Sequence, residues 1–321
     1  MEKLPGLILT IIVGLAAYFL SQINVLFDPL VLGILLGMVI RLIISSRPLL
    51  LPGLEIAPRL LIPLGIVLYG TNLNLYKLSE IAPLAWLQLI VSILVIFWLS
   101  EFLGQLLKID RKVSVLTAVG TAICGASAIV MTVSAIKAKK EDAGKALLVI
   151  TFLGLAAVFI YPFIQKFLLM SESAYALFTA TTLSQTGFVK MAALFLSKNA
   201  ETLALSIKTA RTVFIIPTLI ILTFIFRGEK GEKTEGKIIY WALAGFILTG
   251  LLFSFIPLLI PYATIIKPYS TILWTLALTS IGLTIEIKSL LKNLFRPLIL
   301  GFLLLLAGVT VFMFSYWTIL K

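Results

Sequence analysis

The sequence predicts an all-α polytopic membrane protein with about 9–11 transmembrane helices, and its composition is the first reason. Hydrophobic residues make up 60% of the 321 residues, charged residues only 12%, and the mean hydropathy is +1.13. A soluble domain covers itself with about 25% charged residues. The apolar residues also gather in runs of about twenty, the length that crosses a hydrocarbon core of roughly 30 Å. These observations exclude a soluble globular protein.

Eleven apolar blocks follow one another along the chain, and the first is interpreted as a retained helix. They lie at 5–25, 29–45, 57–74, 81–107, 113–136, 143–169, 174–197, 203–226, 238–257, 268–286 and 295–318. Polar stretches between them are short, so we expect one integral membrane domain over residues 1–321. Its first half is 1–170 and its second half 171–321. The stretch 227–237 has no apolar side chain and predicts an exposed loop.

Basic residues account for the net charge of +12 and gather in short gaps between the blocks. The positive-inside rule predicts this pattern without a nucleic-acid partner. It predicts a cytoplasmic N-terminus and an external C-terminus. We expect the chain to lie in the inner membrane of a bacterium or archaeon. Eleven plain crossings would put the basic cluster at 137–145 outside. We therefore expect 113–136 and 174–197 to be interrupted helices, which either cross or re-enter.

Two distant segments share a motif in opposite predicted orientations. LGIVLYGTNLNLYKL (64–78) and LALTSIGLTIEIKSL (276–290) each end an apolar block, with Gly70 and Gly282 in register. The first is predicted to run from inside to outside, and the second from outside to inside. Inverted repeats of this kind build many secondary transporters, with the substrate site near the membrane midplane.

The first interruption is predicted from GTAICGASAIV (120–130), a run of small residues in an aliphatic block. Glycine weakens a helix by roughly 1 kcal/mol relative to alanine. Lipid tolerates an opened helix only inside protein or beside water. A break frees the N–H groups and positive dipole end of the next half-helix for an anion. Close helix packing through small residues is the alternative. The candidate binding residues are Thr121, Cys124, Gly125, Ala126 and Ser127.

The second interruption is predicted from TATTLSQTGFVK (179–190), the most polar stretch inside any block. A polar helix face in a membrane bundle points to a cavity, because lipid would penalise it. The alternative is a loop outside the membrane that joins the neighbouring blocks. The candidate substrate-binding residues here are Thr181, Thr182, Ser184 and Gln185.

Three cations complete the candidate site. Lys190 lies in the seventh block, and Lys208 and Arg211 lie three residues apart in the eighth, on one helix face. A charge at the centre of a spanning helix costs about 2.5–3.5 kcal/mol on insertion scales, so such residues are functional candidates. Snorkelling to the headgroups is the alternative for Lys208. No deep acidic residue accompanies them, which argues against a cation antiporter.

Enzymatic chemistry finds little support in the sequence. The chain has no histidine and one cysteine, and it lacks a G-x-S-x-G elbow. It therefore cannot form a H-E-x-x-H metal site or a Ser–His dyad. We expect no enzyme, no metal and no cofactor.

The same segments resemble a known family, the YeiH-type sulfate exporter family of bacterial inner-membrane proteins. The resemblance implies inverted repeats, discontinuous helices, a fold distantly like bile-acid and sodium/proton antiporter carriers, and a transport role. The family typically has a His-Glu pair where this chain has Ser184 and Gln185, which argues against a proton-linked role for that pair here. The matching segments are LLGMVIRL (35–42), LGIVLYGTNLNL (64–75), GTAICGASAIV (120–130), KTARTVFIIP (208–217) and LALTSIGL (276–283).

These features predict a secondary transporter, an exporter, of a small inorganic or organic anion such as sulfate. The anion would lie between residues 120–127 and 181–185, with Arg211 compensating its charge and access alternating around the interrupted helices. An anion channel, or a carrier for another small solute, is the alternative. The sequence leaves the oligomeric state open, a homodimer included.

Overall fold

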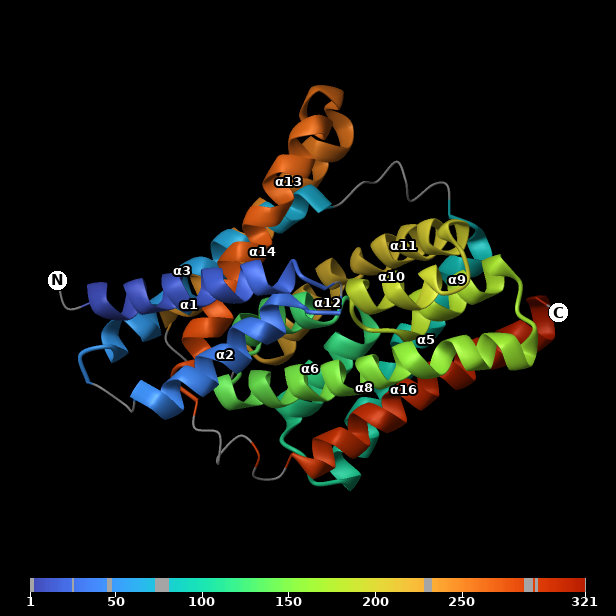
Figure 1. Ribbon diagram of the computed structural model, residues 1–321, viewed down its shortest axis with the longest axis horizontal. Coiled ribbons are helices and arrows are strands. Elements are labelled where there is room, and N and C mark those ends of the chain that lie inside the picture. Colours follow the sequence, from blue (N-terminus) through green and yellow to red (C-terminus); the bar gives the residue numbers. More distant parts are fainter. Residues whose placement is uncertain are drawn as a thin grey trace. The chain divides into compact units, whose positions relative to one another are not determined.

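The computed structural model describes residues 3–24, 26–44, 48–72, 81–227, 233–285, 291 and 294–320. The α-helices are α1 (Leu4–Ser21), α2 (Pro29–Ile44), α3 (Leu51–Tyr69), α5 (Pro83–Leu106), α6 (Arg111–Ala122), α7 (Ala126–Ala135), α8 (Lys140–Leu168), α9 (Glu172–Thr182), α10 (Thr186–Leu194), α11 (Lys198–Thr212), α12 (Ile215–Ile225), α13 (Lys233–Phe255), α14 (Ile260–Gly282) and α16 (Phe295–Ser315) (Figure 1). Short helical turns are η1 (Gly70–Asn72), η2 (Pro257–Leu259) and η3 (Tyr316–Leu320). Each of the eleven predicted blocks coincides with a helix or a pair of helices, so the all-α fold class is confirmed.

Both predicted interruptions are present. Residues 123–125 separate α6 from α7, and residues 183–185 separate α9 from α10. A third break, between α11 and α12, is not predicted from the sequence. Pro217 explains it, because proline lacks an N–H and its ring clashes with the carbonyl four residues earlier, that of Val213.

The predicted exposed loop is only partly covered by the described residues. Residues 228–232 of the stretch 227–237 lie outside them, and α13 already begins at Lys233, within the predicted loop. The tail of the motif at 73–78 and of its counterpart at 286–290 also lies outside the described residues.

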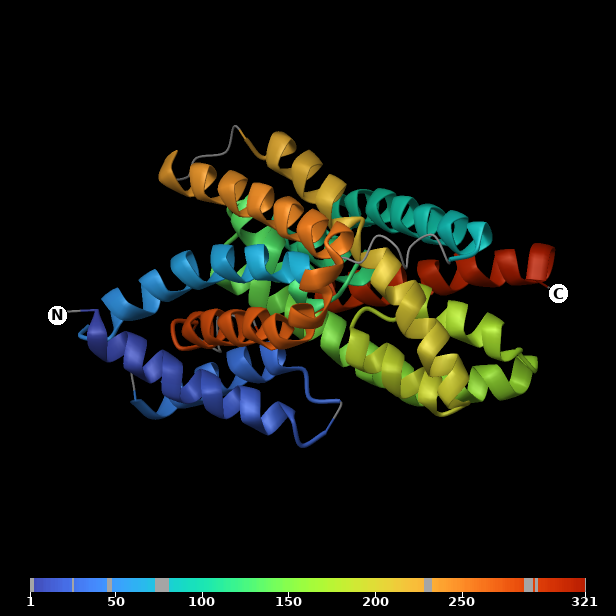
Figure 2. The same cartoon turned by 90° about the horizontal axis from the view of Figure 1, so that it is seen from above.

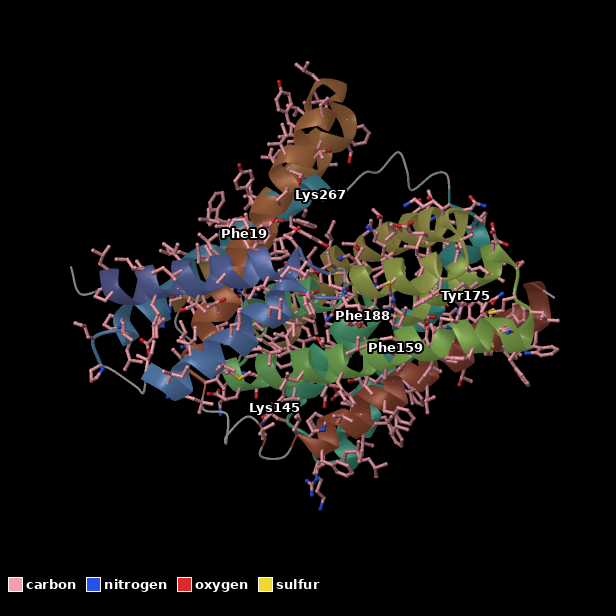
Figure 3. All side chains as sticks on the ribbon, viewed as in Figure 1. Phe19, Lys145, Phe159, Tyr175, Phe188 and Lys267 are labelled. Atoms are coloured by element: carbon pink, nitrogen blue, oxygen red, sulfur yellow. The ribbon has the colours of Figure 1, made fainter. Side chains whose placement is uncertain are left out.

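The helices are built for a bilayer. Among the described residues, six helices are long and apolar enough to cross a membrane, namely Leu4–Ser21, Leu51–Tyr69, Pro83–Leu106, Lys140–Leu168, Lys198–Ile225 and Phe295–Thr318. Shorter apolar helices are Pro29–Ile44, Ala126–Ala135 and Trp241–Phe255. Large apolar side chains are exposed along them: on α8, Phe159 (Figure 3) is 54% exposed and Phe163 74%. Exposed apolar side chains on long apolar helices suit lipid, so the chain is a multi-pass membrane protein.

The chain forms two compact units, each drawn from both halves of the sequence. The first comprises Met1–Leu75, Val130–Gly144 and Ile216–Lys292, and the second Tyr76–Ile129, Lys145–Ile215 and Asn293–Lys321. In the first unit α14 packs against α1, α2 and α3, and α13 packs against α3 (Figure 2). The Trp274 indole donates to the Ile62 carbonyl at 3.2 Å, and the Ser280 hydroxyl donates to the Leu54 carbonyl at 2.6 Å. These bonds fix α14 to α3.

Two glycines let α2 and α14 approach backbone to backbone. A Cβ on Gly37 would come within 2.9 Å of the Leu283 nitrogen, and a Cβ on Gly282 would meet the Ile34 carbonyl. Real Cβ atoms do not tolerate such contacts with backbone, so both positions require glycine for close packing.

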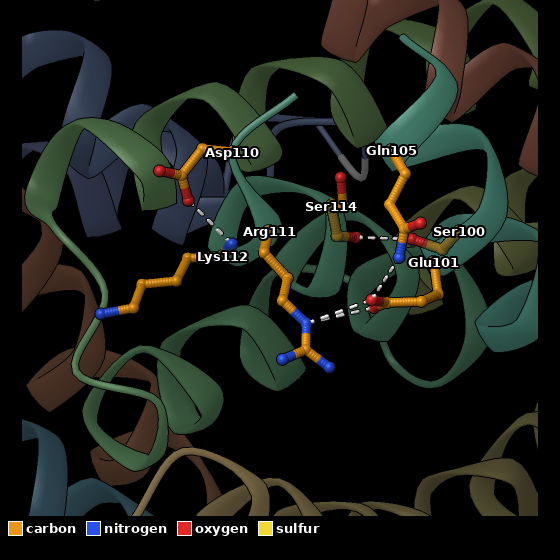
Figure 4. A network of polar contacts seen from close by, with 7 residues as sticks. All are labelled: Ser100, Glu101, Gln105, Asp110, Arg111, Lys112 and Ser114. Atoms are coloured by element: carbon orange, nitrogen blue, oxygen red, sulfur yellow. Dashed lines mark hydrogen bonds and ion pairs between the residues drawn. The ribbon is translucent and has the colours of Figure 1, made fainter. Parts of the chain in front are cut away.

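In the second unit α5, α6 and α16 pack together, and α9, α10 and α11 form a neighbouring group. Figure 4 shows how the start of α6 is fixed. Asp110 caps α6 by accepting from the Lys112 amide at 2.8 Å, and Arg111 lies 3.2 Å from the Glu101 carboxylate. The Ser100 hydroxyl donates to the Ser114 carbonyl at 2.9 Å. These contacts hold α6 on α5 and so place its other end, at the first interruption.

We expect Gly37→Ala to lower the melting temperature of the detergent-purified protein, because an added methyl group overpacks the α2–α14 contact by about 1–3 kcal/mol. Gly308→Ala is the matched control. The nearest atom to its added Cβ is 3.8 Å away, so alanine there should keep or raise stability. Equal melting temperatures for the two variants would contradict the close approach. Fluorescence-detected thermal unfolding measures the difference.

Candidate functional site

The first interruption is a sharp turn that needs glycine. Gly125 has φ +71°, a conformation that costs other residues roughly 1–2 kcal/mol. Its amide donates to the Gly120 carbonyl at 3.0 Å, which closes the end of α6. The Ser127 hydroxyl lies 3.1 Å from the Cys124 carbonyl oxygen and 3.0 Å from the Cys124 sulfur. The turn is therefore built from its own small residues, as the sequence pattern predicts.

The second interruption is extended, with ψ near +140° at Leu183 and Gln185. The threonine hydroxyls before it bond within α9: that of Thr181 donates to the Leu177 carbonyl at 2.8 Å, and that of Thr182 to the Phe178 carbonyl at 2.6 Å. Threonine commonly back-bonds in this way inside helices. In this geometry these hydroxyl protons are directed to α9 itself and not to a ligand.

The two interruptions adjoin. A Cβ built on Gly125 would lie 2.7 Å from the Gln185 Cγ and 3.1 Å from the Ser184 carbonyl oxygen. Gln185 therefore occupies space that a side chain at position 125 would fill. Two breaks that are about sixty residues apart in the sequence meet at one point inside the second unit.

Lys208 joins the ends of the two half-helices that lead into this point. It lies on α11 and is 1% exposed. Its ammonium group donates to the Ile123 carbonyl at 2.9 Å and to the Leu183 carbonyl at 2.8 Å. These two residues are the C-caps of α6 and α9, whose last carbonyls have no partner inside their own helices.

Arg211 also joins the ends of these two half-helices, through its planar guanidinium group, and it is also 1% exposed. Its Nε donates to the Ala122 carbonyl at 2.6 Å, and its Nη2 donates to the Thr121 carbonyl. Its Nη1 donates to the Ala180 and Leu183 carbonyls, each at 3.0 Å. Both cations thus face the negative dipole ends of two half-helices, which is a favourable place for positive charge.

Neither cation is used up by these bonds. Lysine has three N–H donors and arginine five. Within the described residues, Lys208 donates two hydrogen bonds and Arg211 donates four. One N–H on each therefore has no acceptor within the described residues. Half-helices α7 and α10 also begin where the two breaks meet, a point that we call the crossing. The first amides of a helix have no acceptor within that helix. The crossing therefore offers hydrogen-bond donors and positive potential together.

A small cavity lies beside the crossing. Its volume is about 10 Å³, enough for roughly one water molecule. It is lined by Thr121, Thr182, Leu183 and Ser184 at the two breaks, by Ile150, Leu153 and Gly154 of α8, and by Gly301 and Leu305 of α16. Phe188 of α10 (Figure 3) packs against Gly154, where an added Cβ would lie 2.5 Å from the nearest ring atom. This volume is too small for a polyatomic anion in this conformation.

The structure gathers most of the residues predicted from the sequence. Those at the crossing and its two breaks are Thr121, Cys124, Gly125, Ala126, Ser127, Thr181, Thr182, Ser184, Gln185, Lys208 and Arg211. Lys190 is apart from them, because its side chain on α10 is exposed. Lys208 is buried and bonded to two carbonyls, so the snorkelling alternative is wrong for it.

Sequence reasoning missed α8 as part of the site. The Gln185 amide donates to the Thr151 hydroxyl at 2.9 Å, and Tyr161 is buried on the same helix. Thr151, Gly154 and Tyr161 recur at intervals of three and seven residues, which places them on one helix face. That small and polar stripe is the signal that could have identified the helix.

Crossed, interrupted helices with buried cations in an otherwise apolar helical chain define a multi-pass membrane protein with a polar centre. Comparison with known proteins gives the family. Residues 5–301 match the family model described as Conserved hypothetical protein 698, and the chain belongs to this YeiH-type family.

Relatives occur in bacteria and in archaea. A UPF0324 membrane protein of Staphylococcus epidermidis is 28% identical, over 97% of this chain and 96% of the relative. UPF0324 membrane proteins of Bacteroides thetaiotaomicron and Archaeoglobus fulgidus are 27% and 29% identical, over 94% and 92% of this chain and 94% and 88% of the relatives. No solved structure matches the chain.

We expect Arg211→Met to lower the unfolding free energy by at least about 3 kcal/mol, because it leaves four buried carbonyl contacts without their donor. Arg111→Met is the matched control. It removes an exposed ion pair to Glu101, so the loss should stay below about 1 kcal/mol. Thermal unfolding in detergent compares the two. Similar losses would mean that Arg211 does not hold the half-helices together.

Proposed function

We propose that this protein is a secondary transporter, an exporter, of a small anion such as sulfate, and that the anion binds where the two interrupted helices cross. The carrying observation is the pair of buried cations, Lys208 and Arg211, each with one N–H left over after capping the half-helices. A buried cation in a membrane segment is expensive, and a transported anion repays part of that cost.

The half-helices add to this attraction. α7 and α10 start at the crossing, and the positive dipole ends of these half-helices favour a negative ligand. Discontinuous helices near the membrane midplane are the binding elements of many secondary transporters. Backbone that is opened in this way is stable in a membrane only when it is buried in protein or lines a cavity.

The repeated motif supports a carrier as well. Gly70 caps the end of α3 and Gly282 ends α14. An added Cβ on Gly70 would lie 3.1 Å from the Gly250 nitrogen, and one on Gly282 would lie 3.1 Å from the Ile34 Cα. Both motif glycines therefore end a helix and allow close backbone approach, as positions related by an inverted repeat would.

The small cavity favours alternating access over a permanent pore. About 10 Å³ beside the crossing leaves no room for a polyatomic anion until the helices shift. A carrier in a closed conformation has this property. The leftover donors of Lys208 and Arg211 would then meet the anion when the site opens to either side.

Counterflow of labelled sulfate in proteoliposomes tests the proposal. Excess unlabelled sulfate inside should stimulate uptake by the wild type and by Lys190→Met, since the Lys190 side chain is exposed. Lys208→Met should reduce that uptake at least about tenfold, the loss expected from one charged hydrogen bond. Lys208→Arg, which keeps a cation, should retain part of it.

Each variant is first checked for a monodisperse size-exclusion peak. Unchanged counterflow in well-folded Lys208→Met would remove Lys208 from the site. Uptake without stimulation by internal sulfate would indicate a channel instead of a carrier.

A further inference from the structure

Gln185 carries a hydrogen-bond acceptor that its surroundings leave unused. The side chain is 2% exposed, and its Nε2 donates to the Thr151 hydroxyl at 2.9 Å. This bond orients the amide and commits its nitrogen to α8. The Oε1 atom is buried and has no donor within the described residues. Buried polar atoms normally have partners, so this oxygen needs an explanation.

The unpaired Oε1 atom is on a residue that lies at the crossing. Gln185 is the N-cap of α10 but makes no capping bond there, and its Cγ lies against Gly125 at the start of α7. Leu183, two residues earlier, accepts hydrogen bonds from both Lys208 and Arg211. The site thus combines several donors with one buried acceptor.

That combination discriminates between forms of an oxyanion. A fully ionised oxyanion such as sulfate has only acceptor oxygens, so it would satisfy the cations but leave the Gln185 oxygen unpaired and repelled. An oxyanion that still carries one proton has negative oxygens for the cations and an O–H for Oε1. A site that hydrogen-bonds a hydroxyl binds analogues that lack it more weakly, because its own polar group remains unpaired.

We infer that the site prefers a monoprotonated oxyanion, an anion of the hydrogen sulfite, bicarbonate or dihydrogen phosphate type, and that the Gln185 oxygen accepts its O–H. This inference rests on the proposed function and narrows its substrate class. An amide does not titrate near neutral pH, so a proton that crosses the membrane at this site travels on the substrate. Transport then depends on pH through the titration of the anion itself.

Thermal stabilisation of the purified full chain by defined anions tests the inference. Sulfite and inorganic phosphate gain a proton as the pH falls from mildly alkaline to mildly acidic, whereas sulfate and nitrate do not. For the wild type, the apparent affinity for sulfite or phosphate should rise at least about tenfold across this change, and the affinity for sulfate should stay constant.

Gln185→Leu should remove this pH dependence. Thr151→Val should weaken the pH dependence in the same direction, because it releases the amide nitrogen that fixes the orientation of Oε1. Gln88→Leu is the matched control, a buried amide of α5 whose oxygen already accepts from the Ser315 hydroxyl at 2.6 Å. It should keep the wild-type pH dependence.

Three outcomes would overturn the inference. Sulfite affinity that does not change with pH in the wild type, while sulfate still binds, would reject the proton preference and leave the proposed anion site standing. Equal loss of sulfate and sulfite in Gln185→Leu would show that the amide presents its N–H groups. If Gln185→Leu behaves as the wild type, Oε1 faces only water. Absence of any anion effect at every pH would remove the proposed function as well.

Discussion

The structure depends on one interaction, the capping of two helix C-termini by two buried cations. α6 and α9 both end inside the second unit, where water cannot satisfy their last carbonyls. Lys208 and Arg211 supply six hydrogen bonds to these ends from a single helix, α11. Without them the breaks would expose unpaired backbone in an apolar environment. With them, both breaks can remain open inside the second unit.

The capping bonds and the proposed binding site use the same charges for two purposes. Each cation keeps one N–H, so a ligand can bind without dissolving the contacts that hold the half-helices. Gly125 matters for the same reason, because its absent side chain lets the two breaks meet and seats Gln185 between α7 and α8. The same residues therefore support the fold and the proposed site, so a change in either break affects both the fold and the site.

The sequence anticipated the helices and breaks well because lipid makes local rules strict. Glycines, hydroxyls and charges stand out in an apolar block, which is how the break at Gly125 and the buried Arg211 were identified. The sequence could not show which groups Arg211 bonds, since carbonyl partners such as those of Ala180 and Thr121 lie 31 and 90 residues away. The hydroxyl of Thr181 looked available but bonds within its own helix, and Thr151 was a single hydroxyl in an aliphatic run.

The central claim is that the crossing binds an anion through donors that Lys208 and Arg211 do not spend on the backbone. The most direct measurement is an anomalous-scattering map of crystals grown with selenate, which resembles sulfate and scatters strongly. The account predicts a peak within hydrogen-bond distance of the Lys208 ammonium or the Arg211 guanidinium, at the junction of the two breaks. Selenate density confined to exposed basic side chains such as Lys190, with none at the crossing, would contradict it.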